Sequence, residues 1–505
     1  MTRRETLAVL AARLAAPAAT TSFDANFGSA LEAGAAIATG KISSVELTRH
    51  VFERIDKYQP KLNAFVYQMR EEALSSARRA DEMTKRRDAK HSPLTGVPVM
   101  VKESFGIAGR PCTWGIPALK DTRAPANSTA VQRLLDAGAV IAGATNVPLN
   151  LMDGQSYNDI YGTTNNPWDQ SRTPGGSSGG TAAALAAGLG FLGIGSDIGG
   201  SIRAPAHCCG IFGHKPTLDV VGLQGHSPGG APGSPGFTTL LAVGGPLART
   251  AEDLEAGLRI LGGPQRPDSI AYAWHLPPPR HERLRDFRIG YILEDPMFHV
   301  SSEVKPSLET AIRALEKAGA KLRPGWPQGF SLREFTDTYI FMLAAFSYSV
   351  SPPEEQARQR AGFAAVKDDP FAPGSLSDFA SWQTRSLRRL AFRAAWQKYF
   401  EDVDAFVLPA LPVPAFPHDH SAQAQRTIAT PEGRLPYMPA LLGYMSLAIL
   451  TGCPATVAPA GKTKNGLPVG IQILGPYLED ATPIRLAALL AKEIGGFTPP
   501  PGYSM

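Results

Sequence analysis

The order of apolar and polar residues predicts helices that alternate with short buried strands along most of the chain. Ser43-Ser44-Val45-Glu46 has the form of a capping box, in which a serine and a glutamate cover free N–H groups at a helix start. Leu47, Val51 and Ile55 follow at helical spacing, whereas 97–101 is an apolar run of strand length. Other expected helices lie near 27–39, 71–86, 129–137, 181–188, 250–261, 302–319 and 480–494, and other strands near 139–142, 287–293, 404–409 and 469–474.

This alternation favours an α/β fold, in which helices cover both faces of a sheet. At 505 residues the chain can bury a large core, and length alone would allow two or three domains. We see no internal repeat and no long low-complexity segment that would divide the chain.

Composition excludes several classes of partner. The 50 basic and 45 acidic residues leave a net charge of only +5, and the basic residues are scattered, so we expect no nucleic-acid partner. No stretch reaches the roughly 20 uninterrupted apolar residues that a membrane span needs. The four cysteines show no metal spacing, and a disulfide scaffold is not indicated in so large a chain. We expect the adjacent Cys208 and Cys209 to be small buried apolar residues.

The first residues allow two interpretations. Thr2-Arg3-Arg4 precedes a run rich in Ala and Leu, and Ala16-Pro17-Ala18 has the small-x-small form of a cleavage site. This pattern is typical of a twin-arginine export signal and would place the protein in the periplasm. Arg13, however, interrupts the apolar run, which favours a short amphipathic helix and a cytoplasmic protein. We expect the cytoplasmic location and keep the periplasm as the alternative.

The stretch from Thr173 to Arg203 carries the clearest chemistry. Ser177 and Ser201 are both flanked by glycines and are separated by one helix-length segment. Small residues at 198–200 precede Ser201, so their backbone N–H groups can converge on one point. Converging N–H donors are what an oxyanion hole requires, because they stabilise the charge that develops when a carbonyl is attacked.

Lys102 is the candidate base for these serines, since no His–Asp pair at recognisable spacing accompanies them. It ends an apolar strand, where a lysine is unusual unless it has a task. Burial disfavours the ammonium form, so such a lysine can act as a base near neutral pH. The alternative is a lysine at the surface that pairs with Glu103.

Lys102, the Gly-Gly-Ser-Ser-Gly-Gly block around Ser177 and the Asp-Ile-Gly-Gly-Ser-Ile-Arg block around Ser201 together resemble the amidase signature family of serine hydrolases. The resemblance is dense from 43 to 253 and returns at 404–417 and 450–480. It implies a single domain at 26–500, with a large mixed twisted central β-sheet covered by helices on both faces. Residues 1–25 would then be an N-terminal extension.

The resemblance also implies a role for each matching residue. Ser201 would be the nucleophile, Ser177 a bridging serine that follows a cis peptide bond from Gly176, and Lys102 the base. The backbone N–H groups expected to line the oxyanion hole belong to Ile198, Gly199, Gly200 and Ser201. The residues expected to support the site are Gly176, Ser178, Asp197 and Arg203, with Asp197 and Arg203 as an ion pair that brackets the loop.

Other candidates have weaker support. His207 and His214 could be general bases, but the family needs none and we expect structural roles. Met152 and Gln155 are expected to line the substrate site, although the sequence around them departs from the usual family sequence. Residues 331–396 fit the family poorly and are rich in aromatic residues, which at helical spacing usually form core. Because the corresponding region caps the substrate channel in the family, an apolar cap would suit a hydrophobic acyl or aryl group.

The implied function is an amidohydrolase that cleaves C–N bonds of apolar or aryl amides through an acyl-enzyme on Ser201, with esters or carbamates as further substrates. One alternative is the glutaminase subunit of a tRNA-dependent amidotransferase. It would need polar anchors for glutamine, for which only Arg358 and Arg360 stand as candidates, and a partner chain. Another is a non-catalytic scaffold member of the family. We expect no metal and no cofactor, a small-molecule amide as partner, and a homodimer as one form of assembly.

Overall fold

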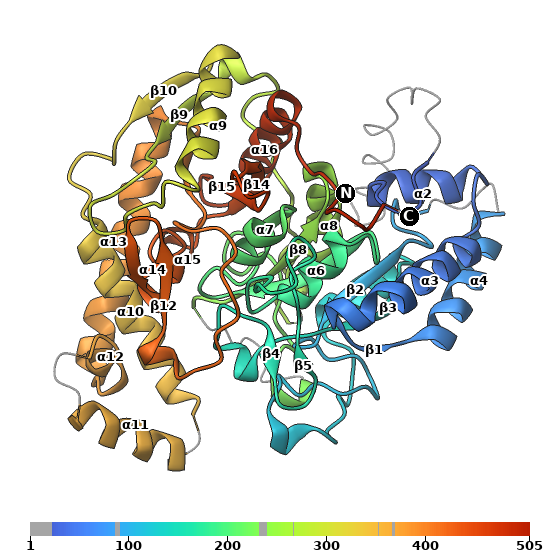
Figure 1. The fold of residues 1–505 in the computed structure, drawn as a ribbon, viewed down its shortest axis with the longest axis horizontal. Helices are drawn as coiled ribbons and strands as arrows, with labels where there is room; N and C mark the ends of the chain where they lie inside the picture. Colours follow the sequence, from blue (N-terminus) through green and yellow to red (C-terminus); the bar gives the residue numbers. More distant parts are fainter. Residues whose placement is uncertain are drawn as a thin grey trace.

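A central sheet of eleven strands organises the protein (Figure 1). The computed structural model describes residues 23–85, 91–231, 240–265, 267–351, 353–365 and 369–504, so the extension expected at 1–25 lies almost wholly outside the described residues. In spatial order the strands are β1 (Phe65–Gln68), β3 (Val140–Thr145), β2 (Pro98–Lys102), β6 (Leu192–Asp197), β8 (Val243–Ala248), β7 (Phe212–Lys215), β14 (Ala455–Lys462), β15 (Pro468–Leu474), β11 (Ala405–Pro409), β9 (Arg288–Tyr291) and β10 (Lys321–Pro324).

The sheet is mixed, as the resemblance implies. Strand β2 runs parallel to β3 and β6, and β9 runs parallel to β10 and β11, whereas the strands between these groups pair antiparallel. Strands β2, β3, β6 and β8 are buried along their whole length, which explains their nearly continuous apolar or small side chains. Two small ribbons, β4 (Tyr157–Asn158) with β5 (Gly162–Thr163) and β12 (Thr427–Thr430) with β13 (Gly433–Pro436), lie outside the sheet.

Helices cover the sheet in two layers. Helices α8 and α9 both contact α16 in one layer, and α6 and α7 contact each other in the other. The helices are α2 (Ala30–Ala38), α3 (Ser44–Leu62), α4 (Arg70–Thr84), α5 (Thr129–Asp136), α6 (Gly179–Ala186), α7 (Arg203–Cys209), α8 (Ala251–Leu261), α9 (Lys305–Lys317), α10 (Leu332–Ser349), α11 (Pro353–Ala365), α12 (Ala372–Ser375), α13 (Phe379–Asp402), α14 (Tyr437–Leu442), α15 (Ser446–Thr451) and α16 (Ala481–Ile494). In the described part of the chain, no helix is long and apolar enough to cross a membrane.

The capping box expected at the start of α3 is confirmed. The Ser43 hydroxyl accepts a hydrogen bond from the Glu46 backbone N–H, and the Glu46 carboxylate accepts one from the Ser43 N–H. The helix expected at 27–39 begins later, at Ala30, because Ser29 and Glu32 form a second capping box that fixes its first turn. Caps thus set both helix starts more exactly than the apolar pattern does.

The packing of α6 depends on its small side chains. All eight of its residues are buried, and they lie between the two serine motifs. A Cβ atom added at Gly180 would come within 2.4 Å of the backbone nitrogen of Asn146. A backbone atom cannot move aside as the end of a flexible side chain can. Only glycine therefore fits at this position.

We predict that Gly180→Ala destabilises the protein by about 1–3 kcal/mol or more, the cost of overpacking a filled core. Thermal unfolding followed by circular dichroism measures the change. Gly362→Ala on α11 is the matched control, because a Cβ there meets nothing within 4 Å and alanine favours a helix. Equal melting temperatures for the two variants would contradict tight packing of α6.

Candidate active site

The parallel pairing of β2 and β6 brings the lysine and the serine motifs to one edge of the sheet. Val101 of β2 lies in register with Ile194 of β6. Lys102 is the last residue of β2, and Asp197, the last of β6, leads directly into the loop at 198–201. The carboxyl ends of neighbouring parallel strands meet at the same edge, where loop residues can form a site.

Lys102 is fully buried and makes two hydrogen bonds with serines. Its Nζ donates to Oγ of Ser177 at 2.7 Å and to Oγ of Ser196 at 3.0 Å. Burial lowers the pKa of Lys102 to about 7, although the nearby Asp197 carboxylate acts in the opposite direction. A substantial fraction of the amine is therefore neutral near pH 7. Ser196 was not among the predicted site residues, since only the alternation of side chains along β6 could have indicated it.

Lys102 does not form the surface pair with Glu103 that was the alternative. Glu103 is also buried, and its carboxylate accepts hydrogen bonds from the backbone N–H groups of Thr113 at 2.6 Å and Trp114 at 2.9 Å. Burial raises its pKa to about 7 despite these bonds. Glu103 thus fixes the following loop and leaves Lys102 to the serines.

The segment around Ser177 is held by its backbone. The Gly176–Ser177 peptide bond is cis. A Cβ at Gly176 would lie 2.5 Å from the carbonyl oxygen of Asp153, so the chain passes too closely for a side chain. The N–H of Ser178 donates to the carbonyl of Ser201 at 3.1 Å, which ties the two serine motifs together.

A buried ion pair braces the loop that carries Ser201. Arg203 Nη2 lies 2.9 Å from Oδ1 of Asp197, and neither side chain is exposed. The same carboxylate accepts hydrogen bonds from the N–H groups of Gly200 at 2.8 Å and Ile202 at 3.1 Å. Burial alone would raise the pKa of Asp197, but the Arg203 guanidinium and these N–H groups hold it below its usual range. The carboxylate is therefore a fixed anchor for the turn.

One of the four expected oxyanion donors already has a hydrogen-bond partner. The N–H of Gly200 donates to Oδ1 of Asp197. By contrast, the N–H groups of Ile198, Gly199 and Ser201 make no hydrogen bond within the described residues, and these three residues are partly exposed. The hydroxyl of Ser201 likewise has no hydrogen-bond partner among described residues, so the structure joins Lys102 to Ser177 but not Ser177 to Ser201.

Apolar side chains pack against this loop. A Cβ at Gly199 would meet Leu442 at 2.9 Å, and one at Gly200 would meet Met445 at 2.7 Å. Tyr339 of α10 donates its hydroxyl proton to the carbonyl of Ile198 at 2.9 Å. These three residues come from segments far along the chain, and no local pattern connects them with Ser201.

The two residues expected to line the substrate site differ in exposure. Met152 is 44% exposed. Gln155 is fully buried, and its carboxamide both donates to the carbonyl of Asp419 at 2.6 Å and accepts from its N–H at 3.0 Å. Its polar groups are therefore used to hold a loop, because both ends of the carboxamide are occupied.

The histidines and cysteines expected to be structural are buried. His207 lies between the backbone N–H of Gly470 and the carbonyl of Val413, and burial lowers its pKa to about 4. His214 contacts Thr456 and Asp480. The four cysteines are free and buried, at Cys112, Cys208, Cys209 and Cys453.

Comparison with known proteins agrees with this arrangement. A family model described as Amidase matches residues 46–483. The chain therefore belongs to the amidase signature family. It is an amide-cleaving enzyme, since the family and its relatives share this chemistry.

Two named relatives illustrate the range of this amidase family. The chain is 32% identical to a subunit of the glutamyl-tRNA(Gln) amidotransferase of Nitrosococcus oceani, over 90% of this chain and 95% of that protein. It is 31% identical to indoleacetamide hydrolase of Bradyrhizobium diazoefficiens, over 91% and 86%. Among solved structures, a bacterial aryl acylamidase shares the fold with a TM-score of 0.78 and 24% identity, covering 95% of this chain and 98% of that one.

We predict that Asp197→Asn destabilises this amidase by about 3–5 kcal/mol, because the variant leaves the Arg203 guanidinium buried without a counter-charge. Denaturant unfolding followed by fluorescence measures the loss. The control is Asp286→Asn, which removes a surface pair with Arg283 and should change nothing measurable. A stable Asp197→Asn variant would show that the pair does not brace the loop.

Proposed function

We propose that this enzyme is a stand-alone amidase that cleaves apolar or aryl amides through an acyl-enzyme on Ser201. The observation that carries the proposal is the buried Lys102 amine, 2.7 Å from Oγ of Ser177 and with a pKa of about 7. A neutral amine in contact with a serine hydroxyl can accept a proton at physiological pH, which a surface lysine cannot.

In the proposed reaction, Ser201 Oγ attacks the amide carbon while its proton passes to Ser177 and the Ser177 proton passes to Lys102. This transfer requires the Ser201 side chain to turn toward Ser177, since the two hydroxyls are not bonded in the structure. The relay then runs backwards and protonates the leaving amine as the C–N bond breaks. Water hydrolyses the acyl-enzyme by the same route and regenerates Ser201.

The N–H groups of Ile198, Gly199 and Ser201 would stabilise the tetrahedral oxyanion. Among the described residues they are the unbonded, partly exposed donors of the loop, and the Asp197–Arg203 pair fixes the turn that presents them. Donors held in place before the reaction cost no reorganisation when the charge develops.

The apolar surface beside these donors supports an apolar acyl or aryl group in the substrate. Leu442 and Met445 pack directly on Gly199 and Gly200, next to the place where the carbonyl would lie. The relative named indoleacetamide hydrolase acts, by its name, on an amide that carries an aromatic indole ring. We propose that residues 331–396, which include Tyr339, form the cap of this substrate channel.

The second candidate is a glutaminase subunit, favoured by the similarity to the amidotransferase relative. The two arginines considered as anchors for glutamine lie on α11. Arg358 is exposed and pairs with Glu355, and Arg360 contacts the hydroxyl of Tyr348. Neither is buried in a pocket that could hold a glutamine carboxylate, so these two arginines do not support the glutaminase.

We predict that the purified protein hydrolyses an aryl anilide and an aliphatic apolar amide faster than free glutamine. Product release is measured for these substrates and for a carbamate and an ester, with Ser201→Ala and Lys102→Met as matched blanks. Both blanks should lose about 10³-fold or more in rate because each removes a member of the relay. Ammonia from glutamine alone would favour the amidotransferase hypothesis, and undiminished activity of Ser201→Ala would contradict catalysis at this serine.

We predict that kcat/KM for an apolar amide falls about tenfold per pH unit below pH 7 and is level above it. Protonation of Lys102 removes the base as the pH drops through its pKa of about 7. The profile is measured with a substrate that does not titrate between pH 5 and 9. A profile that is flat down to pH 5, or one that rises only above pH 9, would contradict Lys102 as the base.

A further inference from the structure

Three arginines form a ladder on one face of α13. Arg385, Arg389 and Arg393 are four residues apart, so their side chains leave the same side of the helix. Arg389 is only 7% exposed, and α13 packs against α10 and α15. We call these three residues the α13 arginines. They place three positive charges on the side of the helix that turns toward the protein.

None of the α13 arginines forms an ion pair with a carboxylate within the described residues. Arg389 donates from Nη1 to the carbonyl of Leu240 at 3.2 Å, and Arg393 donates from Nε to the carbonyl of Thr451 at 2.6 Å. Arg385 lies over the Phe341 ring at 5.2 Å, and Arg393 lies over the Tyr477 ring at 4.3 Å. The neighbouring Arg388, on another side of the helix, does pair with Glu334.

Several polar atoms beside these arginines have no partner in the part of the chain that the structure describes. Nε of Arg389, Nη2 of Arg393 and Oγ of Ser386 are buried without a hydrogen bond there. Ser386 precedes Arg389 by three residues and so shares its side of the helix. Unpartnered buried donors are costly, and buried charges are normally paired. Burial, followed by repulsion from Arg393, lowers the pKa of Arg389, whereas Tyr477 and the Asp219 carboxylate act in the opposite direction. The cluster therefore has the donors and the charge to bind an anion.

The backbone contact of Arg389 joins it to the segment that leads into β8. Leu240 lies three residues before Val243, the first residue of β8, and Val243 lies opposite Asp197 in the sheet register. The loop with Ser201 starts directly after Asp197. Helix α10, which packs on α13, also reaches this loop through the bond from Tyr339 to Ile198.

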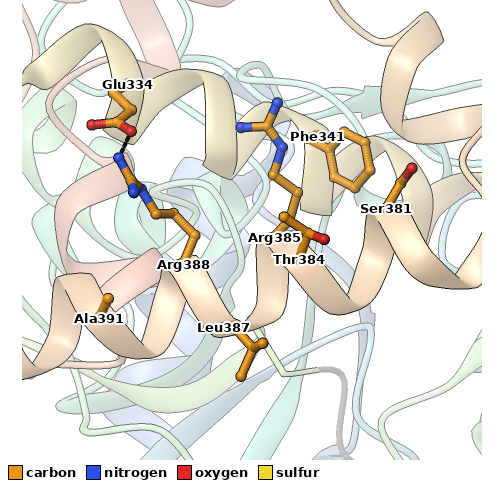
Figure 2. Close-up of a pocket in the computed structure, with 8 residues that line it drawn as sticks. All are labelled: Glu334, Phe341, Ser381, Thr384, Arg385, Leu387, Arg388 and Ala391. Atoms are coloured by element: carbon orange, nitrogen blue, oxygen red, sulfur yellow. Dashed lines mark ion pairs between the residues drawn. The ribbon is translucent and has the colours of Figure 1, made fainter.

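An open groove leads to the first of these arginines. Figure 2 shows Arg385 extending from α13 toward α10 beside Phe341, while Arg388 reaches Glu334 and Leu387 points away. The groove between the two helices has a volume of about 680 Å³. Arg385 is thus accessible from outside, and Arg389 follows it one turn further along the buried side.

We infer that Arg389 and Arg393 bind a carboxylate of the substrate, at the end of the molecule remote from the amide that is cleaved. The inference rests on the proposed function and extends it: the substrate is an amide with an apolar body and a terminal carboxylate. A guanidinium presents N–H donors in a planar fork that matches a carboxylate, and two such groups with the Ser386 hydroxyl can saturate both oxygens.

A matched pair of substrates tests this inference. One is an aryl anilide whose acyl chain ends in a carboxylate, and the other is its methyl ester. Wild type should prefer the carboxylate. Arg389→Met should raise KM for the carboxylate roughly 10- to 100-fold with little change in kcat, the loss expected for a charged hydrogen bond. The ester should be turned over by both enzymes with the same kcat/KM.

Two control variants separate binding from structure. Arg388→Met removes an arginine of the same helix that is already paired, and it should leave both substrates unaffected. Arg389→Lys keeps the charge and should restore part of the preference, and it replaces Arg389→Met as the test if that variant does not fold. An equal loss for carboxylate and ester in the Arg389 variants, or no preference in wild type, would overturn the inference.

A binding measurement keeps the inference independent of turnover. Calorimetry with the Ser201→Ala variant compares the carboxylate anilide with its methyl ester. Tighter binding of the carboxylate, lost on adding Arg389→Met, would support the site even if no amide were hydrolysed. Equal binding of the two compounds would overturn it while leaving the proposed amidase reaction untouched.

Discussion

The burial of one amine is the constraint on which the proposed chemistry of this protein depends. Lys102 ends the buried strand β2, and the protein around it disfavours its charged form, so the amine near neutral pH is a base in contact with Ser177 and Ser196. The Asp197 carboxylate is close enough to oppose this effect, but it is engaged by Arg203 and by two backbone N–H groups. The ion pair therefore holds the Ser201 loop in place. It also limits the effect of the Asp197 charge on the pKa of Lys102.

The sheet explains why these groups can be so close. Strands β2 and β6 are parallel neighbours, and both are buried along their whole length. Their carboxyl ends therefore place Lys102 and Asp197 at the same buried edge of the sheet. The small helix α6 fills the space behind the serines with alanine and glycine. Variation in substrate can then reside in α10 and in the segment that contains Leu442 and Met445, which contact the loop and have no part in the proposed relay.

Much of this arrangement is predictable from the sequence, and the rest depends on distant contacts. The motifs around Lys102, Ser177 and Ser201 predicted the family and the mixed sheet. The pattern of residues did not predict β8, because its Gly-Gly-Pro core has low strand propensity and is held by pairing with β6. Neither Ser196 nor Leu442 is marked by a motif, and the hydrogen bond from the Gly200 N–H depends on the direction in which the Asp197 carboxylate turns.

The most direct test of the account is the titration of the Lys102 amine itself. Lysine labelled with ¹³C at Cε reports its charge state by NMR, and comparison with Lys102→Met assigns the signal. We expect an inflection near pH 7, displaced from the other lysines. An inflection near pH 10.5, the ordinary value for a lysine, would mean that the amine stays charged at neutral pH, and it would contradict the proposed relay at its first step.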